Sequence, residues 1–233
     1  MNSRTHRVLA TLAVLLATVI TGCGSTSSGG ASGGKALVGT FELAPGHCTA
    51  TGATGTYFRM INPGGTIEHG KFFGNPDSAC ADKSFTVQRP GTDGGLVTGG
   101  FQPGPRAAFD SRGDAQASAI VEPGSFTAIK FGISTEQVDP QSRKKVPAPR
   151  ITVRDGRLSG QVTAWSAAWN NLYFNQGSPK PDGSRPGLTS PVSGTYDART
   201  GHFVLTWASQ VVGGPFNGFT GFWHLTGTFK PAD

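Results

Sequence analysis

The chain has 233 residues, of which 35 are glycine, 16 are proline and only 15% are charged. Both glycine and proline destabilise helix interiors, so this composition argues against a helical protein. The formal net charge of +6 is unevenly placed: Arg4 and Arg7 lie in a leader, and one short segment near residue 150 holds all of the remaining excess. The basicity is therefore local, which argues against a surface that binds nucleic acid along the whole molecule.

The first 22 residues have the organisation of a secretory signal peptide. Arg4 and Arg7 precede an uncharged apolar run from Val8 to Ile20. This run is shorter than the roughly 20 residues of a membrane-spanning helix, and it fits the apolar core of a secretory signal. We therefore expect residues 1–22 to be removed and the protein to be exported.

The leader ends on Ile20-Thr21-Gly22-Cys23. An aliphatic residue, two small residues and a cysteine in this order resemble the lipobox of bacterial lipoproteins. The resemblance implies that the Cys23 thiol carries a diacylglyceryl group, with chains such as palmitate, and that Cys23 begins the mature protein. The alternative is an ordinary signal peptide that is cut elsewhere, with no role for Cys23 in anchoring.

Residues 23–35 extend this predicted anchor. The tract from Gly24 to Lys35 is rich in glycine and serine and has no apolar residue larger than alanine. Such a segment behaves as a flexible tether, and two or three acyl chains give stable membrane attachment. We expect a protein anchored by lipid to the extracytoplasmic face of the cell membrane, with one domain over residues 36–233.

Two cysteines remain in the mature chain, Cys48 and Cys80. An even pair outside the cytoplasm predicts a disulfide, which closes a loop of about 33 residues and contributes roughly 3–4 kcal/mol. The alternatives are a metal site or a catalytic thiol. No histidine of the mature chain has a metal-site spacing from either cysteine, so the disulfide is favoured.

The body of the chain predicts an all-β fold, either an antiparallel β-sandwich or a flattened closed barrel built of hairpins. Short alternating runs are separated by glycine, proline, aspartate and asparagine, and no helical stripe follows the leader. A glycine, a threonine and an aromatic residue recur at 39–41, 55–57, 194–196 and 227–229. The glycine and the aromatic ring share one face of a strand there, which leaves room for a neighbouring ring.

The first hairpin is predicted over residues 150–162, with Asp155-Gly156 in a type I′ turn. Its apolar residues then share one face, and its arginines point outward. Segment 143–157 supplies the cationic residues of the chain's basic patch, namely Arg143, Lys144, Lys145, Arg150, Arg154 and Arg157. An exported protein meets anionic lipid headgroups or envelope polymers rather than nucleic acid. The alternative is a solvated face without a partner.

The second hairpin is predicted over residues 203–229, around a five-residue loop from Gly213 to Asn217. Apolar residues alternate along both runs, and keeping both sets on one face requires Trp207 to lie opposite Trp223. A slip of one residue would bring His224 into the core. The sequence therefore specifies the register strongly.

Aromatic and amide residues gather in two stretches that are expected to lie at one end of the sheets. The candidate ligand rim comprises Trp165, Trp169, Tyr173, Phe174, Asn175, Gln176, Phe216 and Asn217. Stacking rings beside amides suit a sugar. The same residues can also be core rings and amides that hold irregular backbone, and this structural interpretation is favoured.

The sequence has no motif of a known catalytic or metal site. The acid pairs Asp77/Asp82 and Asp110/Asp114 offer too few oxygens for calcium. We expect no catalytic residue, metal or cofactor.

Residues 175–184 and 212–225 are similar to segments of exported bacterial proteins of unknown function, a resemblance that transfers no activity. Our first hypothesis is a non-enzymatic envelope lipoprotein with a binding or structural role. The alternative is a glycan-directed binder or hydrolase that uses the rim over Trp169–Gln176.

Overall fold

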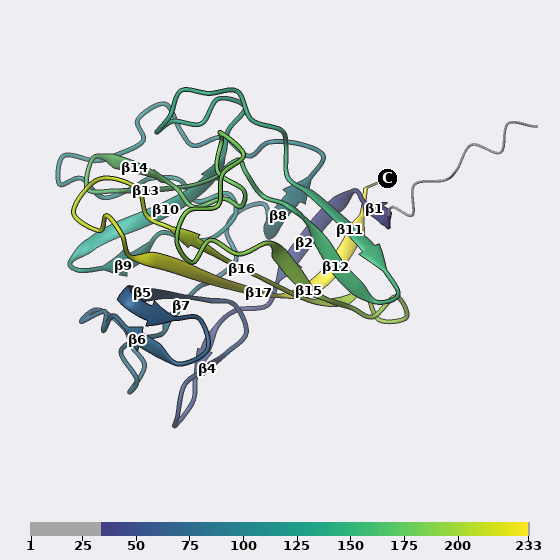
Figure 1. The fold of residues 1–233 in the computed structure, drawn as a ribbon, viewed down its shortest axis with the longest axis horizontal. Coiled ribbons are helices and arrows are strands. Elements are labelled where there is room, and N and C mark those ends of the chain that lie inside the picture. Colours follow the sequence, from purple (N-terminus) through teal and green to yellow (C-terminus); the bar gives the residue numbers. More distant parts are fainter. Residues whose placement is uncertain (1–33, 233) are drawn as a thin grey trace, which may run out of the picture. The chain divides into compact units, whose positions relative to one another are not determined.

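A computed structural model describes residues 34–232, so the predicted signal peptide, the lipobox with Cys23 and most of the tether lie outside the described residues. The described residues form strands and no helix (Figure 1). The strands are β1 (Lys35–Leu37), β2 (Gly39–Leu43), β3 (His47–Cys48), β4 (Ala53–Thr54), β5 (Tyr57–Thr66), β6 (Gly70–Phe72), β7 (Thr86–Val87), β8 (Gly95–Thr98), β9 (Gly124–Phe126), β10 (Ile129–Thr135), β11 (Arg150–Arg154), β12 (Arg157–Gln161), β13 (Trp165–Trp169), β14 (Leu172–Asn175), β15 (Val192–Tyr196), β16 (His202–Gln210) and β17 (Thr220–Pro231).

The largest sheet is antiparallel and has the order β1-β11-β12-β15-β16-β17-β2-β8. Strand β17 is long enough to pair with β16 on one side and with both β5 and β2 on the other. The two ends of this order approach each other, because the Thr98 hydroxyl donates to the Leu37 carbonyl over 2.7 Å and the Gly99 amide donates to the Pro149 carbonyl over 2.9 Å. The prediction of an all-β fold is confirmed, with a nearly closed sheet.

A second sheet of four strands, in the order β14-β13-β10-β9, packs on one face of β16 and β17 (Figure 1). The core between the sheets is built around three tryptophan rings. The ring centroid of Trp165 lies 5.1 Å from that of Trp207 and 5.3 Å from that of Trp223. All three side chains are fully buried. Their large apolar area makes this contact a main source of stability.

Both predicted hairpins have the predicted register. Trp207 lies opposite Trp223, and the apolar residues of β16 and β17 face the core. In the other hairpin Asp155 and Gly156 have φ of 50° and 71°, as a type I′ turn requires. The arginines of β11 and β12 are exposed. Local turn chemistry and alternation were therefore sufficient to place these four strands.

The predicted disulfide between Cys48 and Cys80 is present, with Cα atoms 5.0 Å apart. It joins β3 to the irregular segment before β7. The tether was predicted to run through Lys35, but β1 already begins at this residue, which pairs with Val153. All the strands belong to one compact unit. Residues 34–232 contain no helix long and apolar enough to cross a membrane.

Candidate functional site

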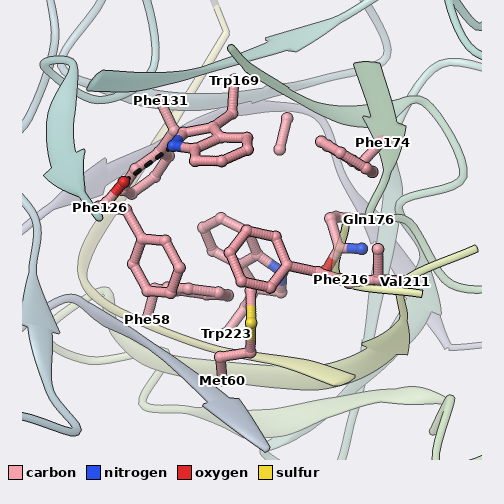
Figure 2. A pocket seen from close by; sticks show the side chains of 11 residues that line it. Phe58, Met60, Phe126, Phe131, Trp169, Phe174, Gln176, Val211, Phe216 and Trp223 are labelled. Carbon is pink, nitrogen blue, oxygen red and sulfur yellow. Dashed lines mark hydrogen bonds between the residues drawn. The ribbon is translucent and has the colours of Figure 1, made fainter. Parts of the chain in front are cut away.

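An apolar cavity of about 50 Å³ lies between the two sheets (Figure 2). It is lined by Phe58, Met60, Phe126, Phe131, Ala167, Trp169, Phe174, Gln176, Val211, Phe216 and Trp223. Seven of these residues carry an aromatic ring. Rigid rings leave unfilled space around a small side chain. Ala167 is the one small side chain in this lining. The cavity is therefore a consequence of alanine at a position surrounded by rings.

Strand periodicity brings these side chains together. Phe58 and Met60 are two residues apart on β5, and Ala167 and Trp169 are two residues apart on β13. Each pair therefore shares a face of its sheet. The β17 residue Trp223 stands opposite Phe58 in the strand ladder, with ring centroids 4.6 Å apart.

The cavity lies closest to solvent at two aromatic rings that contact each other. Nine lining side chains are buried, and only Trp169 and Phe216 are half-buried. Their ring centroids lie 5.3 Å apart. The Trp169 ring is held in place by a hydrogen bond from its Nε1 to the Phe126 carbonyl, 2.8 Å long (Figure 2). We call Trp169 and Phe216 the ring pair at the opening.

Phe216 lies on the connection between β16 and β17, whose glycines at 213, 214 and 218 have φ of 76°, 66° and 86°. Glycine adopts this left-handed region at no steric cost, and it adds backbone freedom. One side of the opening is thus a fixed indole, and the other is a ring on a glycine-rich loop.

Two buried polar atoms lie beside the apolar lining. Neither Gln176 Oε1 nor Trp223 Nε1 has a hydrogen-bond partner among the described residues. Figure 2 shows the Gln176 oxygen on the side of the Trp223 ring. A Cβ atom on Gly221 would lie 2.2 Å from Gln176 Oε1 and 2.9 Å from the Phe58 ring, so glycine at this position leaves room for both side chains. Both atoms are fully buried, so the surface that the cavity presents is apolar.

The neighbouring amide, Asn175, points to the other side and is wholly used within the fold. Its Nδ2 donates to Asp139 Oδ1 and to the Thr163 carbonyl, both over 2.8 Å, and its Oδ1 accepts from the Gly177 amide over 3.1 Å. Asp139 is completely buried. Asn175 therefore compensates a buried carboxylate and leaves no polar group free for a ligand.

Lys180 belongs to the same polar network and lines a hollow of about 250 Å³ beside it. Its Nζ donates to the Asn175 carbonyl over 2.6 Å and to Ser209 Oγ over 2.8 Å. Burial lowers the pKa of Lys180 to about 8, and the charges of Asp139 and Asp182 oppose that change. Ser209 is fully buried and donates to the Gly177 carbonyl, so the arrangement is a structural one.

The depressed pKa of Lys180 makes folding depend on pH. The unfolded chain holds this proton up to its ordinary pKa of 10.5, whereas the folded chain releases it near pH 8. The free energy of unfolding therefore rises as the pH is raised from about 8 to 10.5. This gain is lost as the pH falls back to 8 and below. Relative to Lys180→Met, the free energy of unfolding should rise by about 2 kcal/mol between pH 7 and 9.5. Urea denaturation at several pH values measures this slope, and parallel curves for the two proteins would rule it out.

The residues of the predicted rim do not form one site in the structure. Four of them line the cavity, namely Trp169, Phe174, Gln176 and Phe216. Trp165 is wrong as a rim residue, because it is fully buried in the core. Tyr173 packs its ring on Phe109 outside the cavity, and Asn217 is an exposed loop residue whose Oδ1 accepts from the Gly213 amide.

The opposite wall of the cavity was missed by sequence reasoning. It comes from Phe58, Met60, Phe126, Phe131 and Trp223. Alternation identifies each of these as a core residue, but β5 and β9 approach β13 only through long-range pairing. No local signal shows that core rings from three regions surround a space.

The remaining candidates from the sequence are engaged in turns. Arg112 Nη2 lies 2.8 Å from Asp114 and 3.5 Å from Asp110, so this acid pair holds an arginine within a turn. Asp77 and Asp82 accept from the backbone amides of Ala128 and Ser84. Residues 34–232 hold no group of three or more histidine, cysteine, aspartate or glutamate side chains that could bind a metal.

Comparisons with known proteins add no function to this geometry. No protein-family model, curated protein or solved structure matches the chain. The function therefore has to be argued from the cavity, the cysteines and the leader.

Proposed function

We propose that the protein is a non-enzymatic bacterial lipoprotein, anchored through Cys23 outside the cytoplasm, whose β domain binds an apolar group in the cavity between its sheets. The leader and the lipobox resemblance support export and lipid attachment. The bonded pair Cys48–Cys80 fits an oxidising compartment. The apolar cavity, with its half-buried pair of rings, is the observation that carries the binding role.

The chemistry of the lining selects an apolar ligand. Seven rings and a methionine offer dispersion contacts and exclude water, and a hydrocarbon group that enters gains the free energy of leaving water. Gln176 Oε1 and Trp223 Nε1 are fully buried, so the lining offers a ligand almost no polar surface. The end of an acyl chain is the group that this shape and polarity fit best.

A sugar fits this site poorly. A glycan needs several hydrogen bonds beside a stacking ring, because each desolvated hydroxyl without a partner costs free energy. Asn175 is fully engaged inside the fold, and the exposed Asn217 already holds its own loop. The glycan-directed alternative therefore keeps only one of its three amides, the buried Gln176, and one amide is too few for a sugar.

Filling the cavity tests the proposal. Ala167→Phe places a ring where the cavity lies, so binding of decanoate should weaken by tenfold or more, since the displaced part of the chain loses about 0.8 kcal/mol per buried CH₂. Isothermal titration calorimetry of decanoate into the purified protein measures this. The matched control is Ala107→Phe, which adds the same ring at an exposed alanine and should leave decanoate binding unchanged.

Thermal unfolding identifies a variant that fails to fold, and Phe216→Trp then provides a milder obstruction at the opening. Three results contradict the proposal: no saturable binding by the unchanged protein, equal binding by Ala167→Phe, or tighter binding of an oligosaccharide than of decanoate.

A further inference from the structure

Exposed aliphatic side chains are concentrated in one part of the fold. Within residues 34–232, four large hydrophobic side chains are more than a third exposed: Val38 (55%), Val138 (42%), Leu172 (40%) and Val212 (49%). Val38 joins β1 to β2. The other three lie on the segment after β10, at the start of β14 and just after β16. Such side chains are normal when scattered, and a group of them marks an interaction site.

Direct contacts join these three segments. Gln141 Nε2 donates to the Val212 carbonyl, and Gln141 Oε1 accepts from the Asn175 amide, both over 2.7 Å. A Cβ atom on Gly214 would lie 3.6 Å from Leu172 Cδ1, so the loop after β16 packs on the start of β14. Val138 pairs with Lys145 in an isolated bridge. We call Val138, Leu172 and Val212, with the basic loop 143–145, the loop surface.

Basic side chains accompany the aliphatic ones. Arg143, Lys144 and Lys145 are exposed, and none of them forms an ion pair within the described chain. Two acidic side chains lie on the same part of the fold. Asp182 interacts with the charge of Lys144, and Glu136 interacts with Tyr173. The loop surface is therefore net positive as well as apolar.

Tyr173 follows Leu172 on β14 and brings an aromatic ring to the margin of the loop surface. Burial raises the pKa of Tyr173, Glu136 adds to the rise, and the charge of Arg143 opposes it. Aliphatic, basic and tyrosine side chains side by side are the combination found where proteins meet the membrane interface.

We propose that the loop surface rests on an anionic phospholipid bilayer, with Arg143, Lys144 and Lys145 at the headgroups and Leu172 and Val212 at the edge of the acyl region. The proposal rests on the location inferred above. Charge complementarity favours an anionic membrane over an uncharged protein partner. The loop that begins at Val212 carries Phe216, so the cavity would open close to the bilayer, and an acyl chain could enter it without crossing water.

Fluorescence quenching by brominated lipids tests this contact. Leu172→Trp and Val38→Trp place the same reporter at two exposed positions of the full chain, and Val38 is the matched control away from the loop surface. The chains are added to vesicles of equal parts phosphatidylcholine and phosphatidylglycerol with brominated acyl chains. Relative to the unchanged chain, we expect the tryptophan at position 172 to add fluorescence that the brominated lipid quenches strongly and whose emission maximum shifts to the blue. The fluorescence added by a tryptophan at position 38 should change little.

The charge dependence is measured in the same assay. Combining Leu172→Trp with Arg143→Gln and Lys144→Gln should raise the lipid concentration for half-maximal quenching about 30-fold, the effect of two charges near an anionic surface. Quenching at position 38 as strong as at 172, no quenching at either position, or equal quenching in pure phosphatidylcholine overturns the proposal. If no membrane contact is found but decanoate still binds, the membrane proposal is wrong and the cavity proposal stands. The two proposals can therefore be contradicted separately.

Discussion

Replacing Asn175 by alanine is expected to lower the free energy of unfolding by about 3 kcal/mol, because it removes partners from several buried polar groups. The substitution takes one donor from the fully buried Asp139 carboxylate. It also leaves the Thr163 carbonyl and the Gly177 amide without their side-chain partner. Three buried groups lose a partner together, so the loss is larger than that of a single neutral hydrogen bond, while Asp139 still accepts from the Ser142 amide. Urea denaturation followed by far-UV circular dichroism measures it.

Asn217→Ala is the matched control for this substitution. Asn217 is the other asparagine of the predicted rim, but it is exposed and holds one hydrogen bond within its own loop. Its loss should cost less than about 1 kcal/mol. Equal and small effects of the two substitutions would show that the Asn175 amide is not part of the structural network and would restore it as a ligand group.

Replacing Cys23 by alanine is expected to remove the protein completely from carbonate-washed membranes, because the wash also breaks the peripheral contact of the loop surface. The lipobox resemblance makes this thiol the site of the diacylglyceryl group, and the tether after it has no apolar residue that could hold the chain in a bilayer. Carbonate-washed membrane fractions and incorporation of labelled palmitate measure the attachment.

The control for this experiment is the pair Cys48→Ala and Cys80→Ala together, which removes the disulfide but keeps the lipobox. This double variant should stay with the membrane and keep its label. A Cys23→Ala chain that remains in the washed membranes, or that still incorporates palmitate, would contradict the proposed anchor.

Features set by neighbouring residues could be predicted from the sequence. The turn at Asp155-Gly156 and the pairing of Trp207 with Trp223 are fixed by turn chemistry and by alternation over a few residues. The disulfide followed from cysteine number and from the export that the leader predicts. The two strand pairings follow from the local sequence pattern, and the disulfide joins the only two cysteines that remain after Cys23.

Features set by distant segments could not be predicted. Trp165 and Trp169 have the same local character, yet one is in the core and the other forms the opening of the cavity. The partner of Asn175 is Asp139, 36 residues earlier in the chain, and nothing in either neighbourhood indicates the pair. The cavity itself depends on β5 and β9 being brought to β13, a choice made by the topology of the sheets.

The most direct test of the binding role is the mass spectrum of what the protein carries. The full chain is purified in mild detergent from the cells that make it, extracted with organic solvent, and the extract is compared with that of Ala167→Phe. We predict one class of acyl-chain molecule in near-stoichiometric amount from the unchanged protein, and its loss from the variant with the filled cavity. Identical extracts from the two proteins would contradict a ligand in this cavity.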